Sequence, residues 1–255
     1  MELRPQLTPY LKSLHLSGIL ATLETRNRQA IEDRLSYVDF LSRLLEDEVE
    51  RRDQKRLSLR LRRAAFPDGH TLESFDFAFN PQINRQKVLD LATCTFIERK
   101  ENVLICGPTG VGKSHLAQAL GNEACRRGYD TIFAGTRQED KIMLAHLNGG
   151  RADGTYGRRL ATYMRPDLLI LDDFGLKPLR PPGPEDLFDV IAERYQRRSI
   201  IVTSNRAMSE WADYFDSPLL ASAGLDRLAH NAHTLIITGP SYRARGRTAS
   251  GPAEA

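Results

Sequence analysis

The chain has 255 residues, 41% of them hydrophobic, and a formal net charge of only +3. This length and composition allow one full hydrophobic core and a smaller appended unit. No apolar run approaches the ~20 residues of a membrane-crossing helix, and the first residues do not resemble a signal peptide. We therefore expect neither a membrane-spanning nor a secreted protein.

The cysteine and histidine positions argue against a disulfide framework and against a metal cluster. Cys94, Cys106 and Cys125 form an odd set without metal-ligand spacing. We expect a cytoplasmic protein with reduced thiols, in which Cys106 and Cys125 are small core residues. His230 and His233 have no third ligand nearby in the sequence, so we interpret them as ordinary histidines.

Residues 1–66 have helical periodicity and contain a single glycine, Gly18. Ser36 followed three residues later by Asp39 resembles a capping box, which predicts a helix over 37–64. Such a helix would span roughly 40 Å. We expect a small all-helical N-terminal domain here.

The second half of this helix is strongly basic, and the acidic stretch 46–50 precedes it. The charge bias is therefore local, because the whole chain is nearly neutral. Two interpretations remain open: a solvated helix face balanced by neighbouring acids, or a surface for nucleic acid. The candidate DNA-binding side chains are Arg51, Arg52, Lys55, Arg56, Arg60, Arg62 and Arg63.

An aromatic connector follows. Phe75, Phe77 and Phe79 alternate along the chain, so we expect one side of this segment to be buried against the next domain. Asn80 and Pro81 then predict a helix start, with the asparagine as cap and the proline in the first turn.

The pattern G-x-x-x-x-G-K-[ST] lies between the apolar run 103–106 and a helical stretch that begins near Leu116. This context predicts a phosphate cradle, because glycines let backbone N–H groups point at the β- and γ-phosphates and Lys113 adds a positive charge. A glycine-rich turn with a surface lysine is the alternative. The cradle residues are Gly107, Pro108, Thr109, Gly110, Val111, Gly112, Lys113 and Ser114.

Two adjacent acids, Asp172 and Asp173, end the apolar run 168–171. In an open α/β sheet the ligand binds beyond the carboxyl ends of the strands. Asp172 is then placed to share a Mg²⁺ ion with Ser114, while Asp173 faces the γ-phosphate. A solvated strand-exit turn is the alternative interpretation.

Two further polar residues have both a functional and an ordinary interpretation. Asn205 follows the strand-like run 200–203, where an amide can orient the attacking water, or it caps the next helix. Arg227 lies on a predicted helix before the last strand, where it either reaches a neighbouring subunit's site or is a surface charge.

Helical segments separate most of five strand-like runs, which predicts a doubly wound parallel sheet. One strand and a helical stretch lie between the phosphate cradle and the acidic strand, which argues against the simplest nucleotide-kinase order. We expect no sizeable C-terminal helical lid, because few residues follow the last run. The five runs are 103–106, 131–134, 168–172, 200–203 and 235–238.

Taken in order, these motifs resemble the AAA+ ATPases of the DnaC and IstB group. The N-terminal part, with its Leu16-Ser17-Gly18 sequence, its basic helix and the 75–77 connector, is more similar to IstB-type helpers of insertion-sequence transposition than to replicative helicase loaders. The resemblance covers nearly the whole chain. The motifs that carry it are residues 107–114, 168–175, 203–205, 226–228 and 241–243.

The resemblance implies a role for each site residue. Lys113 would contact the β- and γ-phosphates, and Ser114 with Asp172 would hold Mg²⁺. Asp173 would polarise water, which Asn205 would position.

Arg227 would reach the adjacent subunit, and Arg243 would contact nucleotide from the C-terminal tail. Asp173 stands where the wider AAA+ group has glutamate, so hydrolysis is expected to be slow or to need stimulation by DNA or a partner.

We accordingly divide the chain into a helical DNA- or partner-contacting and assembly domain (1–66), a connector and helix (67–100), an AAA+ ATPase domain (101–242) and a basic, flexible tail (243–255). The resemblance implies head-to-tail assembly with ATP on duplex DNA, without sequence preference, and recruitment and stimulation of a transposase. Arg243, Arg245 and Arg247 are further candidates for DNA contact. A DnaC-like helicase loader, a small-molecule kinase and an N-terminal bundle that binds only a protein partner remain alternatives.

Overall fold

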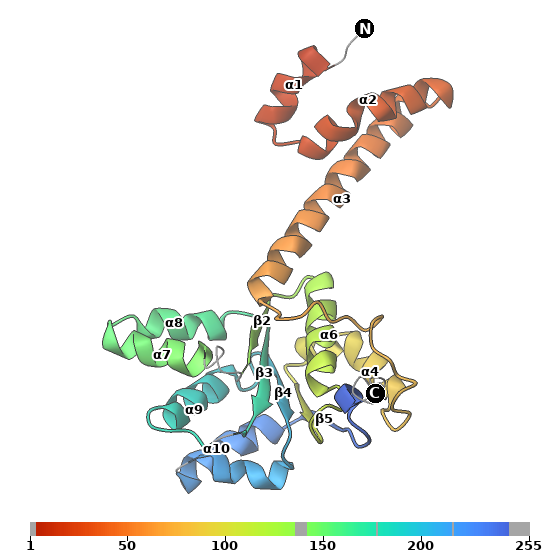
Figure 1. Cartoon of the computed structure of the whole chain (residues 1–255). Helices are drawn as coiled ribbons and strands as arrows, with labels where there is room; N and C mark the ends of the chain where they lie inside the picture. Colours follow the sequence, from red (N-terminus) through yellow and green to blue (C-terminus); the bar gives the residue numbers. More distant parts are fainter. Residues whose placement is uncertain (1–3, 136–141, 177, 216, 245–255) are drawn as a thin grey trace, which may run out of the picture. The chain divides into compact units, whose positions relative to one another are not determined.

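The computed structural model describes residues 4–135, 142–176, 178–215 and 217–244 (Figure 1). Arg245 and Arg247, which we expected to contact DNA, lie outside this range. Among the described residues, no helix combines the length and the apolar character needed to cross a membrane.

The helices and strands follow one another in an α-rich N-terminal part and an alternating α/β part. In chain order they are α1 (Arg4–Ser13), α2 (Ser17–Glu32), α3 (Tyr37–Ala64), α4 (Arg85–Ala92), α5 (Thr95–Glu98), β1 (Asn102–Cys106), α6 (Lys113–Arg126), β2 (Thr131–Ala134), α7 (Ile142–Ala152), α8 (Tyr156–Met164), β3 (Leu168–Phe174), α9 (Gly183–Arg194), β4 (Ser199–Ser204), the 3-10 helix η1 (Met208–Tyr214), α10 (Pro218–Ala229) and β5 (Ala232–Ile236).

The chain divides into two compact units, Met1–Leu59 and Arg60–Ala255, and the division falls inside α3. We call them the N-terminal unit and the α/β unit. Helix α3 begins where its cap predicts, because the Asp39 N–H donates to the Ser36 hydroxyl over 3.2 Å. Ser36 in turn donates to the Asp39 carboxylate, at 2.6 Å.

In the N-terminal unit, α2 and α3 meet through a small apolar core and a buried acid. Ile19, Leu23 and Leu44 form the core. The Glu48 carboxylate on α3 accepts the N–H groups of Gly18 and Ile19 at 2.5 and 3.3 Å. It thereby satisfies two donors in the first turn of α2, which a helix cannot pair internally. The contact between α2 and α3 therefore combines apolar packing with a side-chain cap on the first turn of α2.

The α/β unit contains a five-stranded sheet with strand order β2-β3-β4-β1-β5, and all of its strand pairs are parallel. Helices α4, α5 and α6 supply the core on one face, and α7, α8, α9 and α10 supply it on the other (Figure 1). The predicted doubly wound sheet is confirmed. Strand β4 lies between β1, which leads into the phosphate cradle, and β3, which carries the acids.

Two predicted boundaries were wrong. Helix α4 begins at Arg85 and is capped by Asn84, whose side chain accepts the Lys87 N–H at 3.0 Å. Asn80, the predicted cap, instead reaches across the fold and donates its amide to Thr238 O at 2.6 Å.

Strand β5 is the other misplaced boundary, since the structure places it earlier than the predicted run 235–238. Its pairing with β1 begins at Ala232 opposite Asn102. An edge strand that is only partly buried needs no continuous apolar run, so its first half was not recognised.

The connector packs on the α6 side of the sheet, as the alternating phenylalanines predict for Phe75 and Phe77. The Phe75 ring lies so close to Gly112 that a Cβ there would sit 2.9 Å from it. Phe79 contacts the ring of Tyr242, with centroids 4.9 Å apart. The connector therefore lies directly against the predicted phosphate cradle.

Candidate functional site

The cradle is a tight loop between β1 and α6 that only glycine can form at two crowded positions. Gly107 and Gly110 have φ angles of +153° and +86°. A Cβ at Gly107 would overlap the Ile237 carbonyl oxygen, and one at Gly110 would overlap the Ser241 hydroxyl. The loop is thus built by close backbone approach, as phosphate loops require.

Lys113 begins α6 and points back over the loop. Its Nζ donates to Pro108 O at 2.7 Å and to Asn205 Oδ1 at 2.5 Å. Burial lowers the pKa of this amine, although the nearby carboxylates of Asp173 and Asp172 oppose that effect. The geometry joins three of the predicted site elements: the cradle, the two acids and the amide that follows β4.

The acids lie at an irregularity of the sheet. Leu171 pairs with Val202 and Phe174 with Ser204, so Asp172 and Asp173 together face the single residue Thr203. Such a bulge bends a strand and redirects its side chains. Asp173 accordingly has a left-handed backbone with φ +57°. Asp172 is 4% exposed, which marks it as a buried acid and not as part of a solvated turn.

The oxygen donors fit a divalent cation of the Mg²⁺ type. The Ser114 hydroxyl in the first turn of α6 and the Asp172 carboxylate at the end of β3 are both hard ligands. Among the described residues, no three His, Cys, Asp or Glu side chains form a metal-binding group of their own. A Mg²⁺ ion here would need phosphate oxygens to complete its shell, as is usual for nucleotide-bound magnesium.

The segment that follows β5 crosses the cradle. The Tyr242 N–H donates to Gly110 O at 2.9 Å, which anchors the segment on the loop. Arg243 is exposed and close enough to Lys113 to act on its pKa, which it lowers by repulsion after the larger effect of burial. Arg243 thus lies beside the cradle although it is 130 residues away from Lys113 in the chain.

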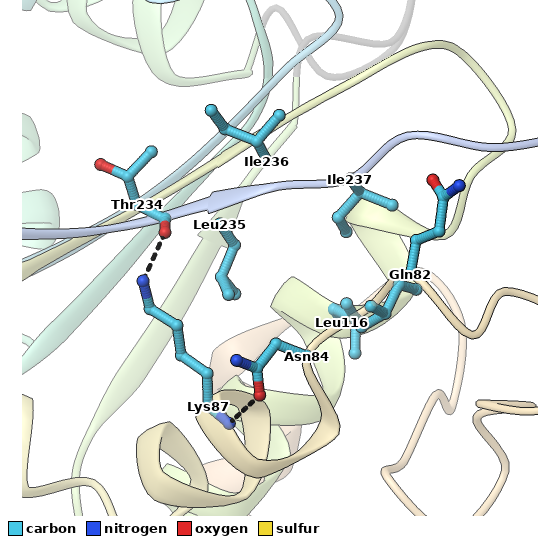
Figure 2. A pocket seen from close by; sticks show the side chains of 9 residues that line it. Gln82, Asn84, Lys87, Leu116, Thr234, Leu235, Ile236 and Ile237 are labelled. Carbon is cyan, nitrogen blue, oxygen red and sulfur yellow. Dashed lines mark hydrogen bonds between the residues drawn. The ribbon is translucent and has the colours of Figure 1, made fainter.

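A cavity of about 190 Å³ lies between α4, α6 and β5. Figure 2 shows Leu116, Leu235 and Ile237 around it, together with the polar side chains of Asn84 and Lys87, which already have structural partners. Asn84 caps α4, and the Lys87 amine donates to Thr234 O at 2.7 Å. The Lys87 amine therefore holds α4 to β5, and we assign no ligand to the cavity.

Arg227 lies at the opposite edge of the sheet from the cradle. Leu228 is the residue after Arg227, and its carbonyl accepts a hydrogen bond from the side-chain amide of Asn102 at 3.0 Å. Asn102 lies at the amino end of β1. The cradle follows the carboxyl end of β1, roughly 16 Å away along a strand of five residues. Arg227 donates to Ala223 O at 2.7 Å, and its guanidinium lies 5.5 Å from the Phe188 ring centroid. Within the described part of the chain, Arg227 therefore lies away from the other predicted site residues.

The basic residues of α3 fall into two groups. Arg52 bonds Glu48 at 2.7 Å, and Arg51 bonds the Ser17 hydroxyl, so these two also hold the start of α2. Arg56 pairs with Asp53 at 3.2 Å, and Arg60 lies 3.8 Å from Asp130. The remaining three are exposed on the surface of their helix: Lys55, Arg62 and Arg63.

Two contacts at this end of the sheet were not predicted, although Thr203 and Pro108 both lie in motifs that the sequence analysis names. Thr203 joins the acids through its hydroxyl, and the Pro108 carbonyl holds Lys113. The position of Thr203 one strand away from the tandem acids was a signal for its contact with them, but it was used only as part of the 203–205 motif. The carbonyl carries no signal, because every residue has one.

Comparisons with known proteins agree with this geometry. The profile of the family described as IstB-like ATP binding protein matches residues 9–250. A Mycobacterium tuberculosis H37Rv protein named as an ATP-binding protein in an insertion sequence is 42% identical over 96% of this chain and 98% of its own. The protein named as the IS21 ATP-binding protein of Pseudomonas aeruginosa is 36% identical over 96% and 91%.

Solved structures show the same fold. AMPPCP-bound DnaA from Aquifex aeolicus superimposes with a TM-score of 0.55 and 24% identity, over 68% of this chain and 51% of DnaA. The DnaC helicase loader gives 0.54 and 21% over 66% of this chain and 96% of the loader. The α/β unit therefore has the P-loop AAA+ architecture, and the chain belongs to the IstB-like ATP binding protein family.

Proposed function

We propose that this protein is an ATP-dependent regulator that assembles on duplex DNA and recruits and stimulates the transposase of an insertion sequence. The observation that carries the proposal is the gathering of Lys113, Asp172, Asp173 and Asn205 at one sheet edge. It occurs in a chain whose relatives are named as ATP-binding proteins of insertion sequences. The alternative of a small-molecule kinase has no comparable support.

ATP hydrolysis is the reaction that this edge supports best. Lys113 and the N–H groups of the cradle would hold the β- and γ-phosphates, and Asp173 would accept a proton from the attacking water. Lys113 donates a hydrogen bond to Asn205, the residue that would position the water. Phosphates that bind Lys113 would therefore also affect Asn205. Arg243, beside Lys113, would add positive charge at the same phosphates.

Ser114 and Asp172 would hold Mg²⁺, which neutralises phosphate charge when it is bound. The short side chain of Asp173 reaches less far than a glutamate would. We therefore propose slow hydrolysis that DNA or a partner stimulates by tightening the geometry.

Assembly would place Arg227 in a neighbour's site. Its position at the amino edge of the sheet supports this role, because it lies about a strand length from its own cradle. Repetition of subunits would present the exposed Lys55, Arg62 and Arg63 along a duplex. Contacts of this kind engage phosphates and carry no sequence information.

The test is duplex binding of random sequence, with and without ATP, at two salt concentrations. We expect ATP to increase affinity and salt to decrease it steeply, because lysine and arginine contacts release counterions from DNA. Affinity that is indifferent to both ATP and salt would refute the DNA-binding proposal.

The partner is tested separately, with purified transposase and with a replicative helicase. Stimulation of strand transfer by the ATP-bound protein supports the proposal. Loading of the helicase without any effect on the transposase would favour the loader alternative instead.

A further inference from the structure

We propose that Thr203 is the positioning residue that fixes both acids at the end of β3, through one hydroxyl group. This inference rests on the proposed ATPase function and deepens it. It concerns a residue that touches neither nucleotide nor metal in the arrangement above.

The first observation is the hydrogen-bond pattern of Thr203. Its hydroxyl donates to Asp172 Oδ1 at 2.5 Å and accepts the Asp173 N–H at 2.9 Å. A hydroxyl has one proton to donate and lone pairs to accept, so both bonds are compatible. One side chain thus orients the carboxylate of the first acid and the backbone of the second.

The second observation is the place of Thr203 in the sheet. The bulge sets two residues of β3 against this one residue of β4. An extra residue in a bulge is left without its regular partner in the ladder. The threonine side chain replaces that partner for Asp173, whose φ of +57° is uncommon for a residue with a Cβ.

The third observation is burial. Thr203 is fully buried and Asp172 is 4% exposed. A water molecule therefore cannot easily replace the hydroxyl as a hydrogen-bond partner. Loss of a partner at a buried carboxylate costs more than loss at the surface. Without the hydroxyl, the Asp172 carboxylate would change its orientation. The ligand geometry for the divalent cation would then change as well.

The experiment compares Thr203→Ser with Thr203→Ala, because both lack the methyl group and only the serine keeps the hydroxyl. Ser204→Ala is the matched control: its hydroxyl donates to Phe174 O at 2.7 Å and is equally buried, but the bond contacts no carboxylate. Melting temperatures show whether each variant folds. If Thr203→Ala does not fold, Thr203→Cys replaces it, since a thiol is a much weaker hydrogen-bonding group.

The first readout needs no nucleotide. Amide hydrogen exchange at Asp173 is expected to be about tenfold faster in Thr203→Ala, the typical net value of one hydrogen bond, and nearly unchanged in Thr203→Ser. Equal exchange in both variants and the wild type would overturn the inference, whatever the protein does with ATP.

The second readout is Mn²⁺ affinity in the presence of a non-hydrolysable ATP analogue. We expect a loss of about 10- to 100-fold for Thr203→Ala, as for other residues that orient a metal ligand, with Thr203→Ser and Ser204→Ala close to the wild type. Analogue binding in EDTA should be the same in all four proteins.

Equal losses in Thr203→Ser and Thr203→Ala would assign the effect to packing and overturn the inference. A wild-type protein that binds no nucleotide would refute the proposed function, while the exchange experiment would still decide the role of the hydroxyl.

Discussion

The carboxyl edge of the sheet and the basic half of α3 are both rich in charge, but they are built differently. At the sheet edge Lys113 and Asp172 are buried, and each is held by a hydrogen bond to a named partner. On α3, Lys55, Arg62 and Arg63 are exposed on one helix. Hydrogen bonds hold the side chains of the first region in place, whereas the charged groups of the second region are exposed to solvent.

The two regions should therefore respond differently to substitution. A site that acts on one phosphate bond depends on geometry, so a single side chain has a large effect there. A surface that binds a polyanion depends on the number of charges, so each side chain contributes a similar small share. We therefore expect single substitutions at the cradle to have larger effects than substitutions on the exposed surface of α3.

Lys113→Ala should weaken ATP binding by about 100-fold or more, because a buried charge-assisted contact to phosphate is lost. ATP-dependent assembly should disappear with it. Lys12→Ala, at an exposed lysine of α1, is the control and should bind ATP as the wild type does. Fluorescent-nucleotide titration measures both. Retained ATP-dependent assembly in Lys113→Ala would contradict the site.

Arg227→Ala should leave ATP affinity almost intact but lower turnover by about 10³-fold, the low end for an arginine that acts across an interface. Mixing it with Lys113→Ala protein should restore part of the turnover. In such mixtures an intact cradle from one subunit meets an intact Arg227 from the other. Loss of ATP binding by a monomeric Arg227→Ala preparation would contradict the inter-subunit role.

Joint replacement of Lys55, Arg62 and Arg63 by glutamine should lower duplex affinity and flatten its salt dependence by about one unit per lost phosphate contact. ATP binding should not change. Glutamine at Lys12, Arg28 and Arg158 removes the same charge from other exposed positions and is the control. Equal losses in both triple variants would mean that net charge, and not the basic half of α3, binds the duplex.

Gly18→Ala should have the smallest effect on chemistry while it loosens the N-terminal unit. A Cβ there would lie 2.8 Å from the Glu48 Cα, so we expect a destabilisation of about 1 to 3 kcal/mol, typical of overpacking. Gly157→Ala in α8 meets nothing within 4 Å and should be neutral or stabilising. Hydrogen exchange in α2, with ATP titration alongside, measures the effect. An unchanged α2 would refute the close contact.

Much of the fold was predictable because buried parallel strands leave a strong signal. The apolar runs at 103–106 and 168–172 lie inside β1 and β3. The cradle motif was equally readable, since its glycines are required by its backbone conformation.

Other features depend on contacts between distant residues. Asn80 resembles a helix cap in sequence, but Thr238 O is its partner in space. The anchoring of Tyr242 on Gly110 and the bonds from Thr203 to the two acids likewise join separate segments. Local patterns identify residues that can hydrogen-bond, whereas the tertiary fold decides with which partner.

We propose that ATP bound at the cradle drives subunits together on DNA. Mass measurement of single particles, with duplex present and with ATP, ADP or no nucleotide, tests it most directly. We predict multi-subunit assemblies on the duplex with ATP, and single protomers or small species otherwise. A protein that binds ATP yet remains a single protomer on the duplex would contradict the account.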